Sequence, residues 1–145
     1  VILRAGTGEI RIREIGILNM HEKSQKEFDI DSPVTIRIHY QVENPVINPV
    51  FNITLHILNS YQVTGFRTDV DGYHVGKIDK DGYIDINVPQ LNLLPNVYSL
   101  DAVIFHQDGY TFYDRVNNVG YLEVKGGLLI NGSTYIPHSW QMHGS

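Results

Sequence analysis

Two groups of residues in this sequence carry side chains suited to binding a sugar. Asn52 and His56 are four positions apart, as are Asp101 and Phe105, so each pair shares one face of an extended chain. Sugar recognition needs hydrogen-bonding groups fixed opposite the hydroxyls and a flat apolar surface for the C–H face of the ring. A carboxylate that accepts from two neighbouring hydroxyls makes a strong, charge-assisted contact. These residue types fit a binding surface of Asn52, His56 and Asp101, with Phe105 and Tyr121 as its aromatic members. The alternative is a solvated sheet face, or one that is covered by an exchanged strand.

A second polar row lies earlier in the chain and is the alternative site. Arg37 and His39 alternate with apolar residues, and Gln41 continues the row. The guanidinium fork of arginine matches the geometry of phosphate oxygens. We expect this row to be the binding face only for a ligand that carries an anionic group.

The other acidic residues fit turns better than catalysis or metal binding. Residues 21–25 (HEKSQ) begin like a zinc-protease motif but lack its second histidine. The Asp-Gly pairs at 71–72 and 81–82 are typical of turns, and they lack the further ligands of a calcium loop. Asp85 and Asp101 fall on different predicted sheets, whereas a glycosidase needs two carboxylates on one surface. We expect no enzymatic activity, no metal and no cofactor.

The elements that must hold these residues are strands. Apolar and polar residues alternate over 34–42, 51–57, 84–88 and 98–104, which indicates strands with one buried face. No helical pattern separates them, so the sequence predicts an all-β sandwich of two antiparallel sheets, immunoglobulin-like or jelly-roll-like. The residues expected in its core are Val34, Ile36, Ile38, Phe51, Ile53, Leu55, Ile84, Ile86, Tyr98, Leu100 and Ile104.

Two local features refine this sandwich. The apolar positions change phase near Glu14, which predicts a β-bulge in the first strand. Leu94-Pro95 followed by Tyr98 is typical of a tyrosine corner, and an ordinary core tyrosine is the alternative interpretation. With Tyr98 in strand F, the strand near residue 10 and those at 34–43 and 83–88 form one sheet, and those at 50–58, 98–105 and 116–125 form the other.

Composition limits the classes of function. The chain has 145 residues and a formal net charge of −5, and its 11 basic residues are scattered, which argues against nucleic acid as a partner. It has no cysteine, so disulfides and thiolate metal sites are excluded. No GxxxxGK[ST] motif is present, and we therefore expect no ATP hydrolysis by this chain. Its length fits one domain, residues 1–145.

Several segments together resemble the C-terminal domain of Wzt, the ATP-binding subunit of ABC transporters that export O-antigen. The segment 48–51 (NPVF), followed by a strand and then 63–68 (VTGFRT), is similar to the most recognisable part of that family. The remaining similar segments are 4–10 (RAGTGEI), 82–88, 93–95 (LLP) with Tyr98, and 136–140 (IPHSW).

The resemblance implies a function for the predicted surface. Such a domain binds the non-reducing end of a finished O-antigen polysaccharide and follows an ATPase domain that is missing from this chain. It implies a homodimer formed by exchange of a C-terminal strand, here 127–140, and contact with the transmembrane subunit through the ATPase domain. The implied location is the cytoplasmic side of the inner membrane.

Two other interpretations compete with glycan recognition. An immunoglobulin-like structural or adhesion domain would use its outward faces to bind protein. A pure dimerisation module would bind no glycan. Trp140, the only tryptophan, lies five residues from the end of the sequence, where a large apolar ring is expected to need a partner.

Overall fold

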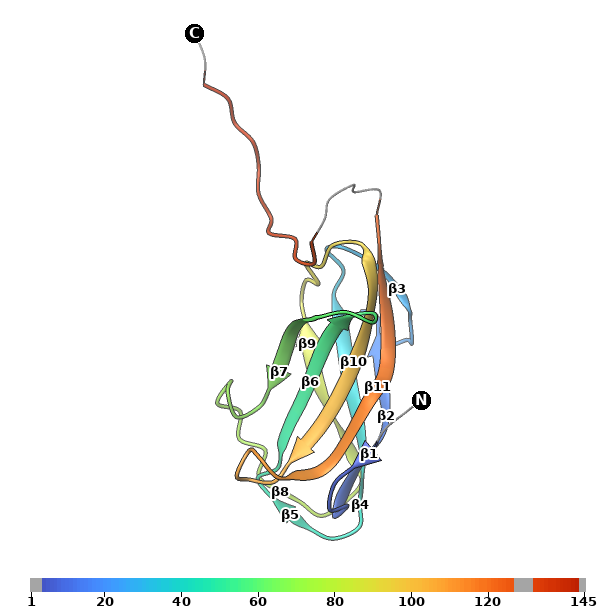
Figure 1. Cartoon of the computed structure of the whole chain (residues 1–145), viewed down its shortest axis with the longest axis vertical. Coiled ribbons are helices and arrows are strands. Elements are labelled where there is room, and N and C mark those ends of the chain that lie inside the picture. The colour runs from blue at the N-terminus through green and yellow to red at the C-terminus, as the bar shows by residue number, and fades with distance from the viewer. Residues whose placement is uncertain (1–3, 127–131, 144–145) are drawn as a thin grey trace.

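The strands expected from the alternating pattern form two sheets that pack face to face (Figure 1). The computed structural model describes residues 4–126 and 132–143, and these residues form strands and loops but no helix. The all-β class and the two-sheet sandwich are therefore confirmed.

The larger sheet has six strands and carries the predicted binding surface. Its central pair runs antiparallel, with Tyr98 opposite Ile57 at one end and Phe105 opposite Val50 at the other. The strand order is β1 (Arg4–Ala5), β11 (Phe112–Lys125), β10 (Asn96–Phe105), β6 (Val50–Ile57) and β7 (Gln62–Arg67), and β3 (Glu27–Asp29) pairs in parallel with β11.

The smaller sheet has three strands, in the order β2 (Ile10–Leu18), β4 (Val34–Val42) and β9 (Gly82–Val88). The pairing of β2 with β4 shifts between Ile12 and Glu14, which confirms the predicted bulge. The division of the predicted strands between two sheets is also confirmed. A short ribbon of β5 (Val46–Ile47) and β8 (Lys77–Ile78) lies outside both sheets.

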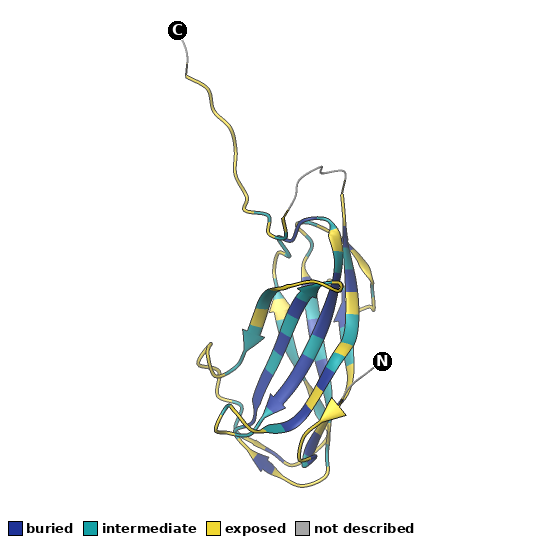
Figure 2. Ribbon diagram, in the orientation of Figure 1, coloured by how far each residue is buried: buried dark blue, intermediate teal, exposed yellow. Residues whose placement is uncertain are grey.

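The core lies between the sheets, and buried and partly exposed residues alternate along β6 (Figure 2). Nine of the eleven predicted core residues are buried: Val34, Ile36, Ile38, Phe51, Ile53, Leu55, Tyr98, Leu100 and Ile104. The prediction was wrong for Ile84 and Ile86, which face the core but stay partly exposed. Their strand, β9, is an edge strand of the smaller sheet, so no further strand covers them.

A buried carboxylate joins the two sheets. The side chain of Asp114 on β11 accepts a hydrogen bond from the Ile12 N–H of β2, with a distance of 2.7 Å. Arg4 lies 3.6 Å from the same carboxylate and donates to the Ile12 carbonyl at 2.8 Å. These contacts link β1 and β11 to β2 and hold one edge of the sandwich closed.

The opposite end of the core is held by the predicted tyrosine corner. The hydroxyl of Tyr98 donates to the Leu94 carbonyl at 2.5 Å and lies 3.3 Å from the Ser133 carbonyl. The side chain is buried, and burial raises the pKa of Tyr98 to about 12. The corner therefore ties the start of β10 to the loop before it and to the segment after residue 132.

We expect Tyr98→Phe to lower the free energy of unfolding by about 1–2 kcal/mol, because the Leu94 carbonyl loses its buried donor. The pKa of Tyr98 is about 12 in the folded chain, above the value of about 10 for an unfolded tyrosine. The folded state thus retains its proton longer, so Tyr98 should cost the wild type stability as the pH rises from about 10 towards 12. Urea denaturation from neutral to alkaline pH should show this loss in the wild type and a smaller one in Tyr98→Phe. Equal loss in both would contradict the assignment.

Candidate carbohydrate-binding site

The outer face of the larger sheet displays its side chains in rows that cross β6, β10 and β11. In one row Ser99 of β10 pairs with His56 of β6 on one side and with Tyr121 of β11 on the other. In the next row Asp101 is opposite Thr54. The strand register therefore brings together His56, Asp101 and Tyr121, three of the five residues predicted from the sequence.

His56 and Asp101 lie in neighbouring rows, on adjacent strands, and their side chains are in direct contact. The Nε2 atom of His56 lies 3.1 Å from Oδ2 of Asp101 and 3.3 Å from Oγ1 of Thr54. The other carboxylate oxygen of Asp101 accepts a hydrogen bond of 2.7 Å from the Asn118 N–H. About a quarter of each side chain is exposed, 26% for His56 and 24% for Asp101, so both can reach a ligand while being held in place.

Tyr121 supplies the exposed aromatic surface beside this pair. Its exposed fraction is 47%, whereas Ser99, the residue between it and His56, is buried. A tyrosine ring offers an apolar face with a polar tip, which suits a sugar ring. The arrangement therefore combines a flat aromatic group with fixed acceptors, as sugar binding requires.

Phe105 lies at the far end of the face and is only partly exposed, because two side chains pack against its ring. The guanidinium of Arg67 stacks over the Phe105 ring at 4.4 Å, and the Phe112 ring packs against it at 5.5 Å. Arg67 is itself fixed by Asp69 and by the Gly109 carbonyl. A ligand would have to displace this guanidinium to stack on Phe105.

Asn52 belongs to this second group of residues. It is opposite Val103 on one side and Arg67 on the other. Asn52 and His56 are four residues apart on β6, which separates them by about 13 Å along a strand. The five predicted residues thus share one face but form two clusters.

The alternative row on the smaller sheet is occupied by its own ion pairs. Arg37 makes a two-pronged contact with Asp85, at 2.8 and 3.0 Å, and a further contact of 3.0 Å with Glu22. These hydrogen bonds raise the pKa of Arg37, and its guanidinium stacks 4.2 Å over Tyr83. His39 lies 3.7 Å from Glu14. Because two carboxylates neutralise Arg37, this face is poorly suited to a ligand that carries an anionic group.

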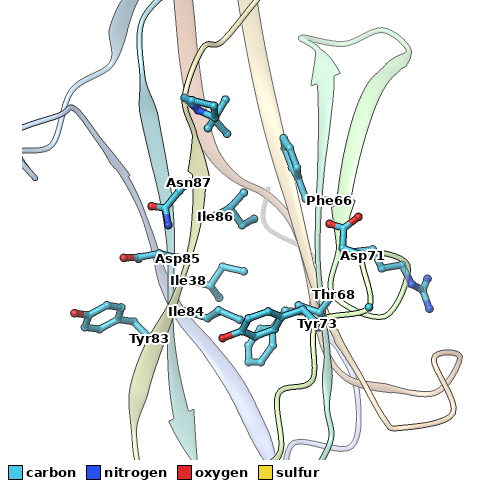
Figure 3. Close-up of a pocket in the computed structure, with 15 residues that line it drawn as sticks. Ile38, Phe66, Thr68, Asp71, Tyr73, Tyr83, Ile84, Asp85, Ile86 and Asn87 are labelled. Carbon is cyan, nitrogen blue, oxygen red and sulfur yellow. Dashed lines mark hydrogen bonds between the residues drawn. The ribbon is translucent and has the colours of Figure 1, made fainter.

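A groove of about 790 Å³ opens on the side of the sandwich, between β7 and β9 (Figure 3). Its floor is apolar and includes Ile84, Ile86 and Phe66, while Tyr73 and Asp71 stand at the β7 side. The floor is the uncovered part of the core. An apolar floor of this kind fits an apolar segment of chain better than a sugar with many hydroxyls.

Two residues that help to shape the outer face were not predicted from the sequence. Asn118 adopts a left-handed backbone (φ 52°) where the β10–β11 register shifts, and this turns its N–H toward Asp101. Asn tolerates that conformation, so the pair Asn117-Asn118 within a predicted strand was a usable signal. Gly65 of β7 lies opposite Thr54 and leaves the surface beside it free of a side chain.

The described residues were compared with the requirements of a metal cluster and of a membrane-spanning helix. Among them, no three His, Asp or Glu side chains lie close enough together to hold a metal ion. Over the same residues, no helix is long and apolar enough to cross a membrane.

Comparison with known proteins assigns the family. The family model described as "Wzt C-terminal domain" matches residues 2–136. The chain belongs to the Wzt C-terminal domain family. The crystal structure of the C-terminal domain of wzt superposes with a TM-score of 0.84 at 15% sequence identity, over 98% of this chain and 89% of that one. No curated protein sequence matches the chain.

The family assignment confirms the resemblance seen in the sequence motifs. The match takes up nearly all of the 145 residues. At 15% identity the solved Wzt domain supports the fold and nothing about individual site residues.

We expect the two aromatic residues of the face to differ in their effect on stability. Tyr121→Ala should change the free energy of unfolding by less than about 0.5 kcal/mol, because the ring is largely exposed. Phe105→Ala should lower it by about 1–3 kcal/mol, because Arg67 and Phe112 lose a packing partner. Urea denaturation measures both. A Phe105→Ala variant as stable as the wild type would show that the ring is free after all.

Proposed function

We propose that this domain is a non-catalytic module that binds O-antigen polysaccharide for export by an ABC transporter. The observation that carries the proposal is the contact between His56 and Asp101 on an open sheet face beside the exposed ring of Tyr121. Membership of the Wzt C-terminal domain family supports the ligand class. The ligand end that we expect to be bound is the non-reducing end of the chain.

The setting of the domain follows from the same proposal. An ATPase domain would precede it in the whole subunit and would connect it to the transmembrane subunit. The bound polysaccharide would then be held on the cytoplasmic side of the inner membrane. The alternative, an immunoglobulin-like domain that binds protein, has no specific contact in its favour on either outer face.

The glycan site is tested by alanine variants on the two faces. Asp101→Ala should weaken binding of O-polysaccharide from the source strain about ten- to a hundred-fold, since a hydrogen-bonded contact of this kind contributes about 1–3 kcal/mol. Tyr121→Ala should also weaken binding, because the sugar ring loses its flat apolar contact. Arg37→Ala is the control on the opposite face and should bind like the wild type. Immobilised domain and purified O-polysaccharide, with that of an unrelated strain as a negative control, give the affinities. Loss of binding in Arg37→Ala alone would place the site on the smaller sheet.

We propose further that the domain forms a homodimer by exchange of its C-terminal segment. Of the predicted segment 127–140, residues 127–131 lie outside the described residues. Ser133 and Tyr135 pair with Leu94 and Asn92, and residues 136–143 then run away from the sandwich (Figure 1). Trp140 is 92% exposed and Met142 93% exposed, so both apolar side chains are available to a second molecule.

The groove between β7 and β9 suits this segment as the binding place in a second copy. An extended strand would present Ile136, Trp140 and Met142 on one face together with His138, because they occupy alternate positions. The groove floor is apolar, and β9 is an edge strand that can pair with another strand. Exchange would cover the partly exposed Ile84 and Ile86 and protect that edge.

We expect the intact chain to be a dimer at micromolar concentration by light scattering. Removal of residues 136–145 should give a monomer, because the exchanged side chains are lost while the contacts of Ser133 and Tyr135 remain. Ile86→Lys should also give a monomer, since it places a charge on the groove floor. Tyr121→Ala is a matched control, because Tyr121 is 47% exposed, does not line the groove, and lies on β11, which β10 and β6 separate from β7. A monomeric intact chain at tens of micromolar would end this proposal.

A further inference from the structure

We infer that Asp101 is a positioning residue: it holds His56 in the tautomer that carries its proton on Nε2, so that Nδ1 accepts a hydrogen bond from a ligand hydroxyl. The inference rests on the proposed glycan site and specifies how that site selects its ligand. In this inference the ring of His56 selects the ligand hydroxyl, and the carboxylate of Asp101 determines the tautomer of that ring.

The first step is that the orientation of Asp101 is fixed by the backbone. Its Oδ1 atom accepts the hydrogen bond of 2.7 Å from the Asn118 N–H. That N–H is directed toward Asp101 by the left-handed conformation of Asn118 (φ 52°) at the register shift between β10 and β11. The remaining oxygen, Oδ2, is thereby turned toward His56.

The second step concerns the proton on the imidazole. Oδ2 of Asp101 lies 3.1 Å from His56 Nε2, which places the charge of the carboxylate directly beside this ring nitrogen. A carboxylate has no proton to donate, and an unprotonated Nε2 would turn its lone pair toward this negative charge at close range. The repulsion favours the tautomer that carries its proton on Nε2. Oγ1 of Thr54, at 3.3 Å from Nε2, can accept from the same N–H. In a neutral imidazole Nδ1 is then left as an acceptor.

The third step is that Nδ1 is open to a ligand. No described residue forms a hydrogen bond with it, and the one fully buried unpaired side-chain atom among the described residues is Oδ1 of Asn92. Nδ1 therefore reaches the surface of the sheet. An acceptor there binds a free hydroxyl, which can donate, and rejects an O-methylated position, which cannot. The chemistry predicts a ligand with an unmodified hydroxyl at this point.

Asp101→Asn tests the inference because Asn118 also determines how the new amide is oriented. The side-chain oxygen must stay with the Asn118 N–H, so the amide nitrogen faces His56 Nε2 and donates to it. The imidazole proton must then move to Nδ1, which turns the open acceptor into a donor. The variant is nearly the same size as the wild type, so any steric exclusion of a methyl group by the face stays unchanged.

The experiment combines nitrogen NMR of the imidazole with a selectivity measurement on the full chain. Two-bond ¹⁵N–¹H spectra, recorded at an alkaline pH where an imidazole is neutral, identify the protonated ring nitrogen. We expect Nε2–H in the wild type and Nδ1–H in Asp101→Asn. The binding probes are methyl glycosides of the sugars in the source strain's O-polysaccharide, together with their singly O-methylated derivatives. At one hydroxyl the wild type should prefer the free form about tenfold, and Asp101→Asn should reduce that preference to less than about threefold.

The matched control is Asp79→Asn, which removes the same charge from an exposed residue of the β8–β9 turn. It should leave both the tautomer of His56 and the selectivity unchanged. Nδ1–H in the wild type, or an unchanged tautomer in Asp101→Asn, would overturn the positioning role. A switched tautomer with an unchanged preference for the free hydroxyl would overturn the claim that His56 recognises that hydroxyl. If the tautomer switches but no glycoside binds the wild type, the glycan assignment fails and the positioning by Asp101 stands.

Discussion

The register between β6 and β10 is the constraint on which the rest of the molecule depends. Side chains alternate between the two faces of a strand, so the same pairing that sends Leu55 and Leu100 into the core sends Thr54 and Asp101 outward. A slip of one residue would bury the carboxylate and expose the leucines, at a large cost in free energy. Burial of the core therefore sets the geometry of the outer face, and His56 meets Asp101 as a consequence.

The unequal size of the two sheets explains the groove between β7 and β9. Six strands face three, so β9 covers its side of the core incompletely and leaves the groove beside β7. Asp114 closes the opposite edge by joining β11 to β2. The polar outer face and the apolar side groove thus serve different partners in our proposals, a glycan for the face and the exchanged segment of a second copy for the groove.

The sequence predicted those features that depend on local alternation. The sheet class, the nine buried core residues, the bulge near Glu14 and the hydrogen bond of Tyr98 all follow from patterns within a few residues of one another. The meeting of His56, Asp101 and Tyr121 on one face also followed, once the strands were assigned to sheets.

The features that the sequence could not predict depend on contacts between distant segments. Phe105 is partly covered by Arg67, a side chain from another strand. Arg37 is neutralised partly by Glu22, which comes from a loop. Ile86 is partly exposed because its strand, β9, is at the edge of the smaller sheet. The alternation of residues within a strand does not indicate whether that strand is at an edge.

The most direct test of the glycan-binding face is a map of backbone amide shifts in the labelled chain as O-polysaccharide from the source strain is added. The account predicts that the perturbed amides cluster on the outer face of β6, β10 and β11, around Thr54, His56, Asp101 and Tyr121. Shifts centred on β4 and β9, around Arg37 and Tyr83, or confined to the groove beside β7, would contradict it.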